Sequence, residues 1–360
     1  MNAVKKISCS DNEFIILGLM ELLRINNLIG ETNEYGGPDE LLFHSGGPVT
    51  KKSARSIIIG PPDFRFKAKQ PSSEILPPNK KSVNPLKGII KLGPKPPNLT
   101  WEVEKWSSNK WIYIKSVSGP SLSKSLSKLE QFLPNSNSAL GTICGAFAYD
   151  LCQWTQPWRL INPPNEKTLL GILFSMERWI IHDRENKIIE IGGNSDDPWI
   201  KDVIELIDSI QNINNLKPNW PKESPIIISS EKSNFNDVEH AKNVEKVQKS
   251  IKSGELYQLN FGRKWIGPLM EEPWNLQLRL AMENPAPWSC FLYSQDLEFC
   301  ICSSSPELLI QGDGVTFSTS PIKGTKQRGE TKQKDLEFIE DLINCPKERA
   351  EHLMLVDLER

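Results

Sequence analysis

Four segments of the chain carry apolar residues at every third or fourth position, a spacing that places them on one face of a helix. These segments are residues 199–213, 237–253, 335–343 and 346–358. Local signals agree with the pattern, because Asp197 and Pro198 stand at the start of the first segment, Gly254 follows the second, and Pro346 opens the last. The sequence therefore predicts four amphipathic helices.

Other segments alternate apolar and polar residues, or hold short apolar runs between turn residues, as strands do. They are residues 111–117, 145–151 and 255–265, a hairpin over 177–193, and the short stretches "SCFLYS", "EFCICSS", "ELLIQ" and "VTFSTS" between residues 289 and 320. Gly312 and Gly314, on either side of Asp313, join the last two stretches as a hairpin. Because no strand–helix–strand unit repeats, the prediction is an α+β fold of antiparallel sheets packed against outer helices.

Residues 61–98 are rich in proline, with nine of the 27 prolines and several lysines. Proline cannot continue a helix or donate to a strand ladder, so this stretch is expected to be an extended, exposed connection. Its basic residues lack interleaved aromatic residues, which argues against a nucleic-acid site. A second break, at residues 214–225, marks the expected boundary between an N-terminal region, 1–225, and a second domain, 226–360.

The overall charge and the cysteines narrow the class of protein. A net charge of −2 gives no general attraction to nucleic acid or to an anionic membrane. Seven cysteines without a CxxC pair fit reduced thiols in a cytosolic, cytoplasmic protein better than a disulfide framework or a zinc site. The apolar run at residues 14–23 is shorter than the ~20 residues of a membrane span, and charged residues surround it, so no targeting or membrane segment is expected.

A lysine and a glutamate are the first candidates for chemistry. If the last two strands form a hairpin, Glu307 faces the end of the second strand, and Lys323 in the loop just beyond comes within its reach. Such a pair can act as an acid and a nucleophile, provided that the amine loses its proton, which the nearby cations Lys326 and Arg328 would favour. Gly324 would allow a ligand close to the backbone. The alternative is an ordinary surface ion pair.

Two further carboxylates, Glu348 and Glu351, lie three residues apart and therefore share one face of the helix that Pro346 opens. Paired carboxylates suit Mg²⁺, which takes one or two of them and keeps several waters. The alternative is a solvated acidic face near a helix N-terminus, which the helix dipole favours. The adjacent His352 has no partner at a zinc-site spacing, and the sequence contains no phosphate-binding loop and no GxSxG motif.

Four motifs in order resemble the chorismate-utilising family, which includes anthranilate synthase component I, aminodeoxychorismate synthase component I, and the isochorismate and salicylate synthases. They are "NPAPWSCFL" (284–292), "SSSPELLI" (303–310), "PIKGTKQRG" (321–329) and "KERAEHLMLVDLER" (347–360), and "SGELYQLNFGRKW", "LLFHSGG" and "GAFAYDL" extend the resemblance upstream. The resemblance implies an anthranilate synthase component I-like fold, with the chorismate-binding catalytic domain in residues 226–360.

Two positions distinguish the members of this family. Gln258 stands where the salicylate and isochorismate enzymes carry a lysine base that activates water, and glutamine cannot act as that base. Lys323 stands where anthranilate synthases carry alanine, and the form "PIKGT" resembles aminodeoxychorismate synthase component I. The resemblance implies amination of chorismate at C4 in 4-aminobenzoate and folate biosynthesis. Lys323 would attack C2, Glu307 would protonate the departing hydroxyl, and a glutamine amidotransferase subunit would supply ammonia. Anthranilate synthase component I is the alternative.

The resemblance also implies other site residues. Glu351 and Glu348 would hold Mg²⁺ against a carboxylate of chorismate, and Gly324 and Thr325 would contact the substrate. A tryptophan pocket, which is inhibitory in anthranilate synthases and structural in some aminodeoxychorismate synthases, would be formed by Ser45, Pro287, Trp288 and Ser289.

Two features depart from the family pattern. Ser320 replaces an arginine that is common just before "PIKGT", and the chain stops at "VDLER", where the family continues with a glycine-rich substrate loop and a second metal-binding glutamate. The fold is therefore expected to be incomplete at the C-terminus, and the 360-residue chain is expected to be inactive. A non-catalytic remnant that still binds tryptophan or the amidotransferase is the hypothesis from a different functional class.

Overall fold

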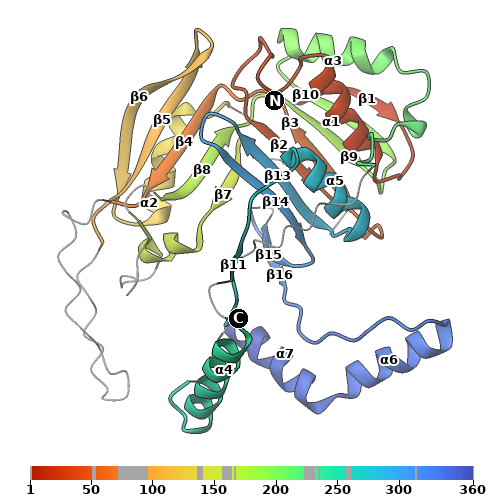
Figure 1. The fold of residues 1–360 in the computed structure, drawn as a ribbon. Helices are drawn as coiled ribbons and strands as arrows, with labels where there is room; N and C mark the ends of the chain where they lie inside the picture. The colour runs from red at the N-terminus through yellow and green to blue at the C-terminus, as the bar shows by residue number, and fades with distance from the viewer. Residues whose placement is uncertain are drawn as a thin grey trace.

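The computed structural model describes residues 2–50, 54–71, 96–135, 141–155, 164–165, 168–222, 232–233, 236–256, 259, 261–312 and 314–359. Two antiparallel sheets face each other, and helices cover the two outer faces (Figure 1). The expected α+β class with antiparallel sheets and outer helices is thus confirmed.

The larger sheet has seven strands in the order β1-β10-β9-β3-β2-β13-β14, and every neighbouring pair is antiparallel. The strands are β1 (Asn2–Ser8), β2 (Glu40–His44), β3 (Arg55–Ile59), β9 (Trp179–Asp183), β10 (Ile188–Gly193), β13 (Trp288–Ser294) and β14 (Phe299–Ser305). Its outer face packs on α1 (Ile15–Ile25), α3 (Pro198–Asp208) and α5 (Pro273–Glu283). Burying this face removes fully enclosed side chains such as Leu19, Trp199 and Phe291 from water, which stabilises the fold.

The smaller sheet has the order β6-β5-β4-β8-β7. Its strands are β4 (Phe64–Lys69), β5 (Leu99–Ser107), β6 (Lys110–Gly119), β7 (Ile143–Phe147) and β8 (Leu169–Ser175), and its outer face carries α2 (Leu122–Leu126) with the 3₁₀ helices η3 (Ser127–Phe132) and η4 (Tyr149–Trp154). Between the sheets, Ile172 and Phe174 of β8 pack with Leu41, Ile59 and Leu292 of the larger sheet. This shared core fixes the two sheets against each other.

The strands of the larger sheet come from both sides of the expected domain boundary. Leu292 of β13 pairs with Leu41 of β2, so a segment after residue 225 completes a sheet that begins near the N-terminus. Residues 223–231 lie outside the described residues, and the division at residue 225 stays a prediction.

Most predicted elements are confirmed, with four differences. Residues 61–98 were expected to be an exposed connection, but β4 lies within them and is mostly buried, and residues 72–95 lie outside the described residues. Strand β7 ends at Phe147, and Tyr149 begins η4, so the strand expected over 145–151 is wrong in its second half. The helix expected over 199–213 ends at Asp208 and is followed by η5 (Ile213–Asn215). The described residues of 255–264 are not in a strand, and only β12 (Trp265–Ile266) forms at the end of that segment.

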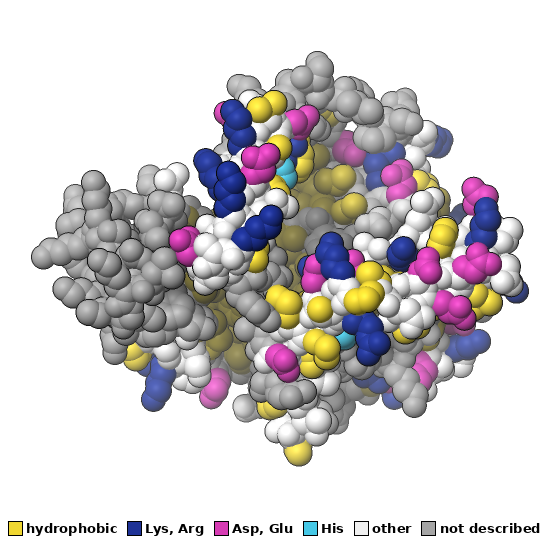
Figure 2. Space-filling view, turned by 90° about the horizontal axis from the view of Figure 1, so that it is seen from below, with side chains coloured by type: hydrophobic (Ala, Val, Ile, Leu, Met, Phe, Trp, Pro, Cys, Tyr) yellow, Lys and Arg dark blue, Asp and Glu magenta, His cyan; other side chains and the backbone are white. Residues whose placement is uncertain are grey.

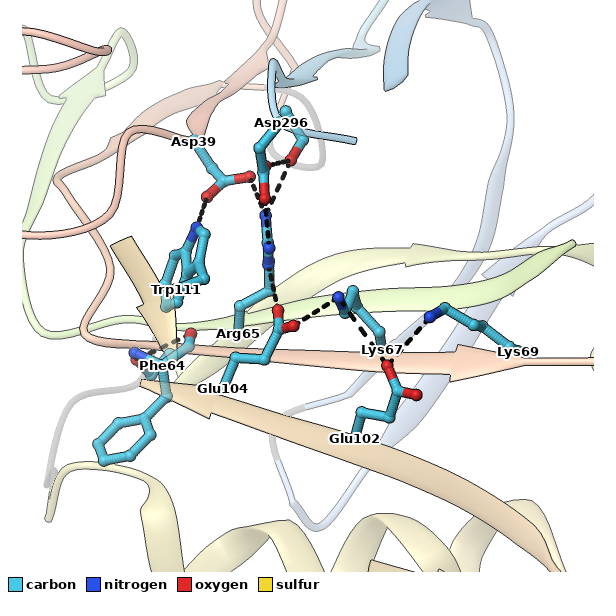
Figure 3. A network of polar contacts seen from close by, with 11 residues as sticks. Asp39, Phe64, Arg65, Lys67, Lys69, Glu102, Glu104, Trp111 and Asp296 are labelled. Atoms are coloured by element: carbon cyan, nitrogen blue, oxygen red, sulfur yellow. Dashed lines mark hydrogen bonds and ion pairs between the residues drawn. The ribbon is translucent and has the colours of Figure 1, made fainter. Parts of the chain in front are cut away.

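Strand β4 is buried although it carries cations, because each cation has acidic partners (Figure 3). Arg65 is 1% exposed, and its guanidinium donates to Glu104 Oε2 at 2.8 Å and to both carboxylate oxygens of Asp296 at 2.7 Å. Asp39 Oδ1 lies 3.4 Å away, and Arg65 also stacks over the ring of Trp111. Burial raises the pKa of Asp39, while Arg65 opposes that rise. The prolines around β4 hid the alternation that identifies it as a strand.

A third group of elements projects from the two sheets (Figure 1). It contains α4 (Asp237–Lys252), β11 (Lys232–Ser233) paired with β12, the ribbon of β15 (Leu308–Gly312) and β16 (Phe317–Ser320), and the helices α6 (Lys332–Asn344) and α7 (Pro346–Glu359). Large apolar side chains are exposed there, among them Leu309, Val315 and Phe317. None of the described helices is both long enough and apolar enough to cross a membrane.

Candidate functional site

The β15–β16 ribbon ties Glu307 to the loop that carries Lys323. The sequence predicts Glu307 opposite roughly residue 319. Leu308 pairs with Ser320, the last residue of β16, so Glu307 instead lies opposite residue 321, just past the end of that strand. Its Oε1 accepts a hydrogen bond of 3.0 Å from the backbone N–H of Ile322. The carboxylate therefore holds the residue next to Lys323.

The far end of the same loop is anchored to α6. The guanidinium of Arg328 donates to both carboxylate oxygens of Asp335 at 2.8 and 2.6 Å, and Gly329 N donates to Oδ1 at 2.9 Å. The hydrogen bond from Arg328 lowers the pKa of Asp335 to about 2, with help from the backbone donor. Lys326 Nζ lies 4.0 Å from Asp341. Both cations expected to assist Lys323 are thus directed toward acids of α6.

Lys323 has its ionic contact with α7. Its Nζ lies 3.5 Å from Glu351 Oε2, and the two side chains are about one-third exposed, at 34% and 35%. Lys347, one turn before Glu351 on the same helix, approaches the other carboxylate oxygen at 3.9 Å. Glu351 therefore lies between two ammonium groups.

Gly324 is required by the close approach of the loop to α7. Its φ is +86°, and a Cβ built at this position would lie 2.8 Å from Glu348 Oε2 and 3.1 Å from Leu342 Cδ1. Positive φ disfavours other residues, and a Cβ here would displace the end of the Glu348 side chain and press on Leu342. Thr325, the other predicted substrate-contacting residue, is exposed.

The loop, α6 and α7 border an open cavity of about 410 Å³. It is lined by Lys323, Leu342, Ile343, Glu348, Arg349, His352 and Leu353. Figure 2 views the molecule from the side of these helices, where acidic and basic side chains are interspersed and apolar side chains lie in the hollow between them. The structure therefore brings Lys323, Gly324, Glu348 and Glu351 together, and Glu307 is linked to them through Ile322.

Sequence reasoning did not assign a role to Arg349 or His352, although both line this cavity. A signal for His352 was available, because Glu348 and His352 are four residues apart and must share one face of α7. Arg349 has no comparable local signal.

Glu348 and Glu351 are the residues that could hold a metal ion. Across the described residues, no group of three or more histidine, cysteine, aspartate or glutamate side chains is arranged to bind a metal. Two carboxylates on one helix face still fit Mg²⁺, because this ion usually takes one or two carboxylates and keeps water for the rest.

The predicted tryptophan pocket coincides partly with a second cavity of about 480 Å³. Pro287, Trp288 and Ser289 line it together with His44 and other residues of β2, β3 and β13. Ser45 is buried beside it, where its backbone N–H donates to Ser56 Oγ at 2.9 Å. Gln258 was the residue from which the sequence analysis argued against addition of water to the substrate. It lies outside the described residues.

His44 and a second buried histidine, His182, share one hydrogen-bonding pattern. Each approaches a backbone carbonyl through Nε2, at 3.3 Å for His44 with Glu13 and at 2.9 Å for His182 with Ser10. A carbonyl only accepts, so Nε2 carries the proton, and Nδ1 of each ring has no partner. Burial lowers the pKa of His44 to about 4 and lowers that of His182. Both rings are therefore neutral parts of the core.

Comparisons with known proteins show the family to which the chain belongs. The family described as chorismate binding enzyme matches residues 100–360. The chain is 29% identical to aminodeoxychorismate synthase component 1 of Bacillus subtilis over 231 residues, which cover 61% of this chain and 47% of that protein. It is equally 29% identical to anthranilate synthase component 1 of Aquifex aeolicus over 252 residues, which cover 66% and 50%.

A solved structure with the same fold is anthranilate synthase component I of Streptococcus pneumoniae. The TM-score is 0.56 at 18% sequence identity, over 87% of this chain and 62% of that one. The expected fold family is thereby confirmed. The chain spans about half the length of the curated relatives that it matches.

Proposed function

Since the chain belongs to the family of chorismate binding enzymes, we propose that it is component I of an aminodeoxychorismate synthase, which aminates chorismate at C4. The observation that carries this proposal is Lys323. It lines the cavity between the loop and α7, and it occupies the position at which the resemblance separates aminating enzymes from anthranilate synthases.

The proposed chemistry uses Lys323 as a nucleophile and Glu307 as an acid. Lys323 Nζ forms a bond to C2 of chorismate while both ring double bonds shift and the C4–O bond breaks, and Glu307 donates the proton with which the hydroxyl leaves as water. Ammonia then forms a bond to C4, both double bonds shift back, and the C2–Nζ bond breaks. Covalent catalysis of this kind replaces one difficult displacement with two easier ones.

This chemistry requires Lys323 to leave its ion pair. An amine attacks only with a free lone pair that can reach the substrate, whereas Lys323 Nζ lies 3.5 Å from Glu351 Oε2 in the structure. Binding of substrate in the cavity must therefore separate the two groups. Glu307 can act without moving the loop, because only one of its oxygens accepts the hydrogen bond from Ile322.

Glu348 and Glu351 are the proposed ligands of Mg²⁺. When bound, the ion would supply positive charge to counter a carboxylate of chorismate. Glu348 is already held beside Gly324 at the wall of the cavity, so the two carboxylates lie on the side where an anionic substrate must be neutralised.

The proposed partner is a glutamine amidotransferase subunit that supplies ammonia. Both relatives described above are named as component 1, which supports a second component. No segment of this sequence resembles a glutaminase.

The test is product analysis. Residues 1–360, joined to the remaining C-terminal portion of the Bacillus subtilis relative, are incubated with chorismate, Mg²⁺ and ammonium, and the products are identified by chromatography and mass spectrometry. We expect 4-amino-4-deoxychorismate. Release of anthranilate together with pyruvate would instead identify an anthranilate synthase, which is the alternative favoured by the equal identity to the Aquifex aeolicus relative.

A further inference from the structure

Two cysteines on β14 stand side by side on one face of the strand. Cys300 and Cys302 are two residues apart, so their side chains point the same way, toward the helix-covered face of the larger sheet. Their sulfur atoms lie 3.6 Å apart, and Cys302 Sγ lies 3.4 Å from the carbonyl oxygen of Pro273 at the start of α5. Both thiols are free and partly exposed. β14 is the last strand of the sheet in its described part.

We propose that Cys300 and Cys302 form a two-thiolate binding site for a soft divalent metal cation of the Zn²⁺ and Cd²⁺ class. The spacing of the sulfurs carries this proposal. Two metal–sulfur bonds of about 2.3 Å to atoms 3.6 Å apart enclose an angle of about 103°, close to the tetrahedral value that Zn²⁺ adopts with thiolates. The cation therefore fits without movement of the strand.

A disulfide between the same residues fits less well. Alternate residues of an extended strand are about 6.6–6.8 Å apart at Cα, which is the upper end of the range that a disulfide spans. The sulfurs would also have to approach from 3.6 Å to about 2.05 Å, which requires the strand to bend. The geometry therefore favours a metal ion bound by both sulfur atoms over a disulfide bond between them.

Metal binding must release protons from the pair. The two thiols lie in contact, with their sulfur atoms 3.6 Å apart. A metal ion binds the thiolate, so each thiol gives up its proton to solvent as its metal–sulfur bond forms.

Solvent would supply the remaining coordination positions, because both thiols are partly exposed. In the part of the chain that is described, no third acidic, histidine or cysteine side chain joins the pair.

The experiment is a titration of the purified chain with Cd²⁺, followed by the ultraviolet absorbance that arises only from cadmium–thiolate bonds. We expect one ion per chain and proton release on binding. Cys300→Ser and Cys302→Ser should each weaken binding at least about tenfold, because even loss of a group behind a metal ligand costs 10–100-fold. Cys152→Ser, which removes a partly exposed thiol of η4 on the smaller sheet, is the matched control and should bind Cd²⁺ as the parent does.

Thermal unfolding of each variant separates loss of the site from loss of the fold. If the serine variants melt as the parent does and still bind Cd²⁺ equally well, the proposal is wrong. Should they fail to fold, phenylarsine oxide, which bridges close thiol pairs, is applied to the parent. Peptide mapping must then find Cys300 and Cys302 protected together, and protection at any other pair of cysteines overturns the proposal.

Discussion

Lys323 Nζ lies 3.5 Å from Glu351 Oε2, so the candidate nucleophile and a candidate metal ligand form one ion pair between the loop and α7. A carboxylate that binds a cation offers less negative charge to a neighbouring ammonium. Occupation of Glu351 by a metal ion would therefore weaken its hold on Lys323. In the proposed reaction, Lys323 would thus be released from Glu351 at the step in which the substrate binds.

Removal of either catalytic candidate should lower amination in the joined protein described above. Glu307→Ala should cost about 10²–10⁴-fold in turnover, because it removes a positioned acid. Lys323→Ala should cost less, since ammonia can attack directly in relatives that carry alanine. Lys334→Ala, an exposed lysine of α6, is the control and should leave turnover unchanged. Product formation is measured by chromatography, and full turnover in Glu307→Ala would remove that residue from the chemistry.

Gly324→Ala should destabilise the chain more than Gly254→Ala. Both glycines have positive φ, at +86° and +76°, so each substitution costs about 1–2 kcal/mol of backbone strain. Only at Gly324 would the new methyl group meet another atom, Glu348 Oε2 at 2.8 Å, whereas nothing lies within 4 Å at Gly254. Urea unfolding of the two variants gives the difference. Equal losses of stability would show that the loop and α7 are not packed this closely in solution.

The contribution of His44 to stability should fall as the pH is lowered below about 6.5. The pKa of His44 is about 4 in the folded chain against 6.5 as a free side chain, so the unfolded state takes up a proton first. The neutral ring contributes fully above pH 6.5, and its contribution is lost as the pH falls toward 4, by about 3 kcal/mol at most. Glu40 and Glu177, whose pKa values burial raises to about 7, act in the opposite direction over the same range. His44→Asn should therefore change the difference in stability between parent and variant as the pH falls from 6.5 toward 4. Urea unfolding at several pH values measures it, and identical slopes for variant and parent would contradict the assignment.

Arg65→Met should lower the free energy of unfolding by about 3–5 kcal/mol, because it leaves buried acids such as Asp39 without a counter-charge. Arg55→Met is the matched control. Arg55 also lies on a strand and pairs with Asp183 at 2.9 Å, but its side chain is 61% exposed, and such pairs contribute about 1 kcal/mol or less. Comparable losses in the two variants would mean that the charges around Arg65 are better solvated than the structure indicates.

The sequence predicted those parts of the fold that depend on local patterns. The strands between residues 288 and 320 have apolar runs and glycine turns that act over a few residues, and they form as expected. Strand β4 was missed because Arg65 and Lys67 are tolerated in the core only through partners that are distant in the sequence, such as Glu104 and Asp296.

In the candidate site too, the sequence predicted the local contacts and missed the contact with a residue that is distant in the sequence. The contact of Glu307 with the loop before Lys323 follows from a hairpin, and the sequence anticipated it to within two residues. The ionic partner of Lys323 could not be anticipated, because Glu351 reaches it only after the intervening α6 has reversed the direction of the chain.

The contact between Arg65 and Asp296 spans 231 positions of the chain. It crosses residue 225, where a protein engineer would first think of exchanging one half of this chain for the same half of a relative. Such an exchange would combine Arg65 from one protein with the turn at position 296 from another, although the two did not evolve together. An incoming half without an acid where Asp296 stands would remove the partner that binds Arg65 through two oxygens, and would leave the guanidinium with Glu104 and Asp39 alone. The two halves are thus linked by charge, and a recombined gene would keep this contact only when both partners arrive from one parent or match by chance.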